Sequence, residues 1–373
     1  MVELSIATGK YPNIIGSDAA FRRIRREFAA VRSGERRSTL LVSGDSTNAG
    51  KGSGSGDANL ENGARAKRPV AVMANILNSM GIPARADSIA GRQGIAPSTI
   101  AHYTEYNPDV TFGATWTFAT SEAISGSMLS EASPNTGAMV FTPKRAADRF
   151  DILYPRGGAF GAITVSDAGG TLTGGSISQT GADAMLLAST ARVTAATTPV
   201  NIARASGGTV YINAVIPWNS TLPEFCIVDG SCVGWRASNY TDTSQYWSPR
   251  NSLAPIGANL HYIELGLNDI SLGDSLSTYL TNLETWVDLC QAQSGTQSAI
   301  LGISAPGDGS YALPVEWRRG IANLARDKDI VLIDHYSRFV SRAADTSLYS
   351  DNVHLTAPGS AMKGALLASL AML

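Results

Sequence analysis

The chain has 373 residues, a formal net charge of −2 and a pI of about 6.1, which gives no electrostatic basis for binding nucleic acid or an anionic membrane. Its length exceeds what one hydrophobic core usually organises, so about two domains are expected. No apolar run reaches the ~18 residues of a membrane span, and the N-terminus lacks the pattern of a signal peptide. The compartment therefore stays open between an intracellular protein, export by another route and a missing leader.

Residues 1–38 are expected to form an N-terminal extension with one helix. The run from Phe21 to Arg37 carries seven arginines, and apolar residues recur within it at helical spacing, at Phe21, Ile24, Phe28 and Val31. We interpret this run as an amphipathic helix with a solvated basic face. The alternative is an arm that docks on another subunit.

The next segment, 39–102, has the order strand, loop, helix, strand. A buried strand is expected at 39–43, and the glycine- and serine-rich stretch 48–63 is typical of a loop. Pro69 suits the first turn of a helix that Gly81 ends, and a strand is expected at 84–90.

Between 103 and 222 charged residues become rare, and glycine, threonine, serine and alanine dominate. Short apolar runs separated by turn signals predict an inserted β-sandwich, jelly-roll-like, with the possibility of carbohydrate binding. The expected strands are 150–154, 160–165, 185–188, 200–203 and 209–216.

Strands and helices alternate again from 223 to 373, which predicts a parallel sheet. The expected strands are 225–229, 260–265, 299–303 and 330–333, and the expected helices are 241–250, 275–291, 314–327 and 357–372. Ligands of such sheets bind at the carboxyl ends of the strands.

Three short segments carry the chemistry. The sequence SGDST at 43–47 ends one expected strand, GLND at 266–269 ends another, and DNVH at 351–354 precedes the last helix. Acyl transfer needs a nucleophilic hydroxyl, a base, a carboxylate that orients the base, and donors for the oxyanion. These segments supply all four.

The three motifs resemble those of the SGNH/GDSL hydrolase family over roughly 36–100 and 225–373. The resemblance implies a flavodoxin-like, three-layer α/β/α core with a parallel sheet. It implies that Ser46 is the nucleophile, that Asp351 and His354 complete a triad, and that the Asn268 amide donates to the oxyanion.

The family also has a backbone N–H donor from a glycine after the second core strand, and two glycines are candidates. The family segment often reads Asn-x-Gly-x-x-Gly. The segment Asp229-x-Ser231-x-x-Gly234 keeps this spacing, although two of its three residue types differ. Gly91 follows the expected strand 84–90. We favour Gly234 and Ser46 as the backbone donors and keep Gly91 as the alternative.

Other candidates are weighed against these residues. His335 follows the strand 330–333 and is the rival base, whereas His261 and His102 are expected to be structural. Asp269 is expected to be a local cap or turn residue, and Asp45 is expected to be structural.

No cofactor or metal is expected. Residues 44–51 only faintly resemble a phosphate loop, because five residues separate the glycines and Gly52 follows the lysine. No Gly-x-Ser-x-Gly elbow and no HExxH motif occur. The three cysteines, an odd number without a CxxC, favour neither a disulfide framework nor a zinc site.

The predicted function is a serine esterase that removes short acyl groups, with O-acetyl groups of a polysaccharide or glycoconjugate as the expected substrate. The expected partners are an acetylated carbohydrate or a small ester, without nucleic acid or membrane. The argument uses the aromatic residues scattered among polar ones in and just after the insert, namely Trp116, Trp218, Trp235, Trp247, Tyr211, Tyr240 and Tyr246. The alternatives are a lipase or thioesterase, or an inactive carbohydrate-binding protein. The composition also suggests a phage or cell-surface protein.

Overall fold

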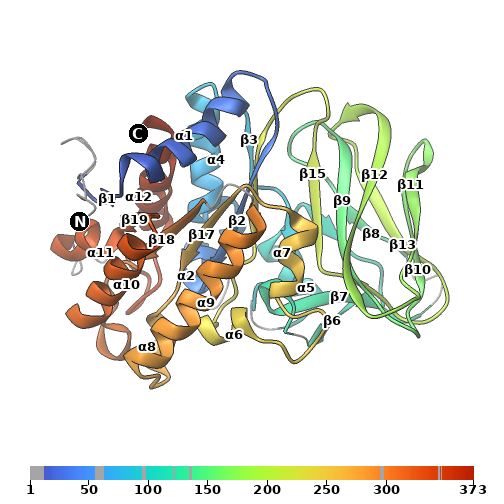
Figure 1. Cartoon of the computed structure of the whole chain (residues 1–373). Helices are drawn as coiled ribbons and strands as arrows, with labels where there is room; N and C mark the ends of the chain where they lie inside the picture. The colour runs from blue at the N-terminus through green and yellow to red at the C-terminus, as the bar shows by residue number, and fades with distance from the viewer. Residues whose placement is uncertain are drawn as a thin grey trace.

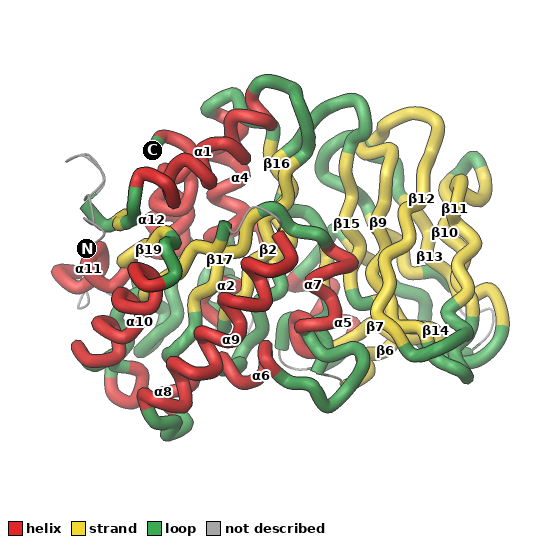
Figure 2. The backbone as a smooth tube through the Cα atoms, in the orientation of Figure 1, coloured by secondary structure: helices red, strands yellow, loops and turns green. Residues whose placement is uncertain are grey.

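The computed structural model describes residues 12–54, 63–94, 98–120, 122–133, 137–294, 298–342, 345 and 347–373. The expected loop at 48–63 therefore lies partly outside the described residues. Helices and a parallel sheet occupy one side of the molecule, and antiparallel strands occupy the other (Figures 1 and 2). Among the described helices, none has the length and apolarity that a membrane span requires.

The parallel sheet has seven strands in the order β1-β19-β18-β17-β2-β16-β3, and only β1 is antiparallel to its neighbour. Strand β2 lies between β16 and β17, so the chain continues from β2 to β3 on one side of it, and β17, β18 and β19 follow later on the other side. Ligand sites of open α/β sheets form at such a point. The strands are β1 (Ile14–Ile15), β2 (Ser38–Gly44), β3 (Ala84–Arg85), β16 (Phe225–Asp229), β17 (Leu260–Glu264), β18 (Ala299–Ile303) and β19 (Val331–Asp334).

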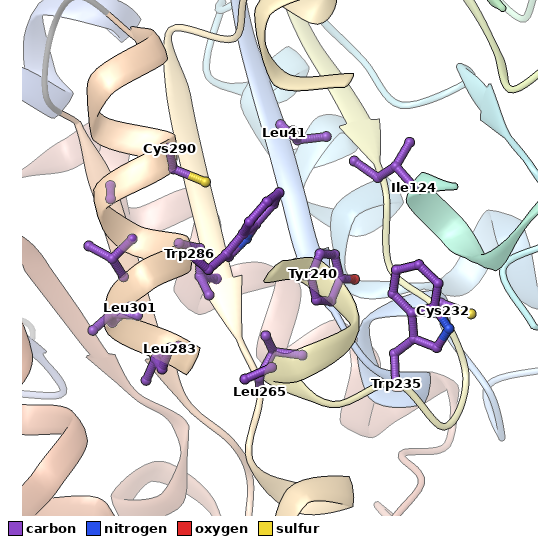
Figure 3. Close-up of a cluster of buried hydrophobic side chains, with 14 of the residues drawn as sticks. Leu41, Ile124, Cys232, Trp235, Tyr240, Leu265, Leu283, Trp286, Cys290 and Leu301 are labelled. Carbon is purple, nitrogen blue, oxygen red and sulfur yellow. The ribbon is translucent and has the colours of Figure 1, made fainter. Parts of the chain in front are cut away.

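Helices cover both faces of this sheet, because alternate strand residues point to opposite sides. Leu40 and Val42 pack with α1 (Asp18–Arg32), α4 (Pro69–Ser79) and α12 (Ala357–Ala368). Leu41 packs with the cluster under the other helices, drawn in Figure 3. These are α6 (Ala237–Thr241), α7 (Arg250–Ile256), α9 (Leu276–Ser294) and α10 (Val315–Asp327). The expected three-layer α/β core is confirmed.

Short helical segments fill the connections. They are α2 (Ser46–Ala49), α3 (Ala64–Lys67), α5 (Ile100–Tyr106), α8 (Leu267–Ser271), α11 (His335–Phe339), η1 (Ile124–Gly126), η2 (Gly309–Tyr311), η3 (Val340–Arg342) and η4 (Ser369–Met372).

The added antiparallel sheets confirm the expected β module. One sheet has nine strands in the order β4-β15-β9-β12-β11-β10-β13-β8-β5, and a second has the order β14-β7-β6. Their buried side chains form a separate hydrophobic core. The strands are β4 (Ile89–Ala90), β5 (Val110–Thr111), β6 (Thr117–Thr120), β7 (Ser127–Glu131), β8 (Met139–Phe141), β9 (Ala147–Arg156), β10 (Ala162–Asp167), β11 (Gly170–Ser178), β12 (Ala184–Ala196), β13 (Val200–Ser206), β14 (Val210–Ile212) and β15 (Ala214–Trp218).

Three expected elements are wrong. The strand at 209–216 is split, because β14 pairs with β7 in the three-stranded sheet while β15 pairs with β9 in the nine-stranded sheet. The strand at 84–90 is split, because β3 pairs with β16 in the parallel sheet while β4 pairs with β15 in the nine-stranded sheet. The helix at 241–250 is replaced by α6 and α7, which flank that range. Between them Asp242 Oδ2 accepts hydrogen bonds from Ser244 and Ser248, and such side-chain bonds compete with helix formation.

Candidate active site

Four segments meet at the carboxyl edge of the parallel sheet. Ser46 follows β2. Cys232, after β16, donates its N–H to the Gly44 carbonyl at 3.0 Å. Asn268, after β17, donates from Nδ2 to the Trp235 carbonyl at 3.0 Å. The fourth segment, 351–354, reaches this edge with the His354 side chain, which contacts Ser46.

Ser46, His354 and Asp351 form one hydrogen-bonded chain. His354 Nε2 lies 2.8 Å from Ser46 Oγ, and His354 Nδ1 lies 2.7 Å from Asp351 Oδ2. Ser46 is 6% exposed and His354 is 8% exposed, so bulk water competes little for these hydrogen bonds. A carboxylate on Nδ1 fixes the tautomer that leaves Nε2 free to accept the serine proton. The structure therefore brings together three of the residues that the motifs single out.

The Asp351 carboxylate is itself held by the loop. Its Oδ1 accepts the backbone N–H groups of Val353 at 2.9 Å and His354 at 2.7 Å. Burial alone would raise the pKa of Asp351, but the hydrogen bonds from His354 and the backbone lower it well below its usual value.

A tight turn presents Ser46. Asp45 caps the short helix α2, since its Oδ1 accepts the N–H and the hydroxyl of Thr47, both at 2.9 Å. Gly44 leaves room for the Asn48 amide, because a Cβ at position 44 would lie 2.5 Å from Asn48 Nδ2. Asp45 is thus a helix cap, in keeping with the structural role expected from the sequence.

An aromatic row supports the same edge. The Tyr240 ring lies between the rings of Trp235 and Trp286 (Figure 3). Its centroid is 5.0 Å from that of Trp235 and 5.2 Å from that of Trp286. The Tyr240 hydroxyl accepts the Gly44 N–H at 3.0 Å and lies 2.7 Å from the Gly44 carbonyl and 3.1 Å from the Gly230 carbonyl. Tyr240 thus joins the turn after β2 to the loop after β16, a role that sequence reasoning missed.

The two glycine candidates differ in what their N–H groups contact. The Gly91 N–H donates to the Asn213 carbonyl at 2.6 Å and is already engaged. Gly234 is exposed in a turn with φ +80°, and its N–H has no acceptor among the described residues. This turn includes Trp235, whose carbonyl accepts from Asn268. The geometry therefore favours Gly234 over Gly91 as a backbone donor beside Asn268.

Asp269, next to Asn268, caps the helix that follows the Gly234 turn. Its Oδ1 accepts the Ala237 N–H at 2.9 Å, so it caps a helix 32 residues away in the chain and not its own segment, contrary to the expectation. Burial raises the pKa of Asp269 to about 7, and the nearby charge of Asp274 adds to the effect. A carboxyl group beside the site thus titrates near neutral pH.

The other histidines lie in separate environments. The rival base His335 is fully buried, with Nε2 2.8 Å from the Tyr262 hydroxyl, and burial lowers its pKa to about 4. His261 is buried within β17, and burial lowers its pKa to about 4. His102 lies 3.5 Å from Glu105. His354 is the histidine that contacts Ser46.

Sequence reasoning missed a buried ion pair beside this turn. Lys363 and Glu264 are both 0% exposed, and Lys363 Nζ also donates to Thr47 Oγ1 at 3.1 Å. The available signal was a lysine in an apolar C-terminal helix and a glutamate at the end of an apolar strand. Among the described residues, no cluster of three or more His, Cys, Asp or Glu side chains could hold a metal ion.

Some of the aromatic residues are engaged in packing. Trp116 and Tyr240 are buried and offer no free face to a sugar. The half-buried Trp218 donates from Nε1 to Asp151 at 2.9 Å, and the Arg37 guanidinium lies 4.3 Å from its ring centre, over one face. Tyr211, Tyr246 and Trp247 are half-buried.

Comparison with known proteins identifies one family model. The model for the GDSL-like lipase/acylhydrolase family matches residues 172–362. This span includes GLND at 266–269 and DNVH at 351–354 but begins after Ser46. No curated protein sequence matches the chain.

Solved structures resemble the molecule more widely. A peptidoglycan O-acetylesterase is similar over 95% of this chain and 97% of its own, with a TM-score of 0.64 and 15% identity. A family two carbohydrate esterase from Clostridium thermocellum is similar over 70% of this chain and 97% of its own, with a TM-score of 0.34 and 10% identity. Only the first similarity is close enough to indicate a shared fold, and it extends over the parallel core and the β module together.

Proposed function

Because the chain belongs to the GDSL-like lipase/acylhydrolase family, we propose that it is a serine esterase whose catalytic triad is Ser46, His354 and Asp351. The observation that carries this proposal is the continuous hydrogen-bonded chain from Ser46 Oγ through the His354 ring to Asp351. A serine hydroxyl is a weak nucleophile unless a base lies within hydrogen-bond reach, and here the base is oriented by a carboxylate.

The reaction follows from this geometry. Ser46 Oγ forms a bond to the ester carbonyl carbon while its proton moves to His354 Nε2. The tetrahedral intermediate collapses as the carbon–oxygen bond to the alcohol breaks, and His354 returns the proton to that alcohol. Water then attacks the acyl-enzyme with the same base, which releases the acid and restores Ser46.

The oxyanion of each intermediate would be held by three donors. They are the Ser46 N–H, the Gly234 N–H and the Asn268 amide. Asn268 Nδ2 carries two hydrogens, and its bond to the Trp235 carbonyl uses one of them. The other is free to donate to the oxyanion.

The proposed substrate class is short-chain esters, with O-acetyl groups of a carbohydrate first. The similarity to a peptidoglycan O-acetylesterase over almost the whole of both chains supports this choice. The large apolar side chains that are exposed on the described residues come from separate segments, which argues against the apolar lid of a lipase. They are Val193, Leu222, Leu272, Val315, Val340 and Met372.

The domain division stays a proposal, with an N-terminal extension at 1–38, a hydrolase core at 39–102 and 223–373, and the β module at 103–222 between them. The pairing of β4 with β15 extends the larger β sheet to residues 89–90. Recognition of carbohydrate by the β module likewise remains a prediction.

Acetate release from a panel of acetylated glycans tests the substrate class, with Ser46→Ala as the control. A series of p-nitrophenyl esters then separates an esterase from a lipase. Faster turnover of acetyl than of long acyl esters is expected. Equal or faster turnover of the long chains would contradict the proposed substrate, and turnover by Ser46→Ala would contradict the proposed nucleophile.

A further inference from the structure

A group of buried polar side chains lies directly behind the turn that presents Ser46. Lys363 and Glu264 are 0% exposed, and Thr47 is 4% exposed. None of these three takes part in the reaction steps described above. Moving charged groups out of water is costly, so their presence at this place requires an explanation.

The Lys363 ammonium group is fully satisfied within this group. Nζ lies 2.9 Å from Glu264 Oε1, 2.8 Å from Glu264 Oε2 and 3.1 Å from Thr47 Oγ1. An ammonium group has three hydrogens and here has three acceptor atoms. Burial alone would raise the pKa of Glu264, but the Lys363 charge lowers it to about 2, which favours the carboxylate form of Glu264.

Glu264 and Thr47 extend the contacts to both residues that follow Ser46. Asn48 Nδ2 donates to Glu264 Oε2 at 3.3 Å, and the Tyr262 hydroxyl donates to the same oxygen. The Thr47 hydroxyl donates a hydrogen bond to Asp45 Oδ1 at 2.9 Å and accepts one from Lys363 Nζ. The turn is therefore fixed on either side of the nucleophile.

The three partners come from the three segments that carry the proposed catalytic residues. Thr47 is adjacent to Ser46, and Glu264 ends β17, four residues before Asn268. Lys363 lies in α12, nine residues after His354. One ammonium group thus fixes the relative positions of segments that are far apart in the sequence.

Stability alone is a weak reason for such a pair. Well-packed apolar residues often replace a buried ion pair without loss of stability, whereas directed hydrogen bonds fix the relative positions of chain segments. A displacement of about 1 Å in a reacting group can cost on the order of a hundredfold in rate.

We propose that Lys363, Glu264 and Thr47 are positioning residues that hold the Ser46 turn in register with Asn268 and His354. This inference rests on the proposed function, since it concerns the alignment of the same nucleophile.

The test compares Thr47→Val with Thr47→Ser. Valine keeps the shape of threonine but loses the hydroxyl, whereas serine retains it. Thr190→Val is the matched control, because Thr190 is likewise buried and its hydroxyl donates a hydrogen bond, at 3.2 Å to the Phe150 carbonyl within the β module. The readouts are kcat and KM for p-nitrophenyl acetate, the rate of Ser46 labelling by a fluorophosphonate, and the melting temperature.

For Thr47→Val we expect kcat and the labelling rate to fall by roughly ten- to a hundredfold with little change in KM. Thr47→Ser should restore most of both rates, and Thr190→Val should match the wild type in both. A Thr47→Val protein that melts lower but keeps the wild-type kcat and labelling rate would overturn the inference. A wild-type protein that neither turns over the ester nor reacts with the probe would contradict the proposed function itself.

Lys363→Met combined with Glu264→Gln provides a second, charge-balanced test. Glutamine can still accept from Tyr262 and Asn48, and methionine fills the space of the lysine stem without leaving an unpaired charge. We expect a folded protein with at least a tenfold lower kcat. A folded double variant with wild-type kcat would overturn the inference.

Discussion

At the scale of single residues, the proposed site consists of donors and acceptors whose partners are already in place. His354 is oriented by Asp351, and Asp351 is held by two backbone N–H groups. Asn268 contacts the turn that carries Gly234. Each side chain can therefore meet the developing charge with little reorganisation, which is the condition for strong transition-state stabilisation.

Asn268→Ala tests the oxyanion role. Removing one such donor is expected to lower kcat by roughly 10²–10³-fold, about 3–4 kcal/mol, with a smaller effect on KM. The measurement is steady-state hydrolysis of p-nitrophenyl acetate, with circular dichroism as the check on folding. A variant that retains more than half of the wild-type kcat would remove Asn268 from the oxyanion site.

Asp269→Asn tests the raised pKa of Asp269. Between pH ~4 and ~7 the folded protein holds a proton that the unfolded chain has lost, so this group makes stability fall as the pH rises through that window. Asparagine removes the titration but can still accept the Ala237 N–H. We expect the free energy of unfolding of the variant, relative to that of the wild type, to rise by about 2–4 kcal/mol from pH 4.5 to pH 7.5. Urea unfolding at both pH values measures this, and an unchanged difference between the two proteins would contradict it.

At the scale of elements, the loop after β16 is supported from both parts of the molecule. On the core side, Cys232 donates its N–H to the Gly44 carbonyl. On the β-module side, η1 lies so close that a Cβ on Gly126 would overlap the Cys232 sulfur. The β module therefore supports the loop that carries Gly234, in addition to any role in recruiting substrate.

Gly126→Ala tests this support. Gly126 has φ +86°, where a side chain costs about 1–2 kcal/mol, and the new methyl group would also displace Cys232. We expect a lower melting temperature and a fall in kcat of about tenfold as the Gly234 turn shifts. Gly158→Ala is the matched control, since no atom lies within 4 Å of a Cβ there and both values should stay near wild type. Equal kcat in the two variants would show that η1 does not influence the site.

At the scale of the whole molecule, local patterns predicted the strands of the parallel core, because apolar runs such as 260–265 are buried on both sides. The resemblance of short motifs to a known family singled out Ser46 and His354 as proposed catalytic residues, although 308 positions separate them in the chain. What local patterns could not supply was long-range pairing. Nothing near residue 89 indicates β15 as its partner, and nothing near Lys363 indicates Glu264.

The error at 241–250 has a local cause instead. The segment is rich in threonine, serine and aspartate and contains Pro249, which are poor helix formers, and the Asp242 carboxylate holds it in turns through serine side chains. The choice between Gly234 and Gly91 as a backbone donor to the oxyanion depends on long-range contacts. The Gly91 N–H donates to the Asn213 carbonyl, a partner that no local pattern indicates.

The central claim is that His354 activates Ser46, and labelling of the folded protein by a fluorophosphonate, followed by peptide mapping, tests it most directly. The account predicts one adduct, on Ser46, that is absent from Ser46→Ala and forms far more slowly in His354→Ala. A folded wild-type protein that stays unlabelled, or that labels equally fast without the His354 imidazole, would contradict the account.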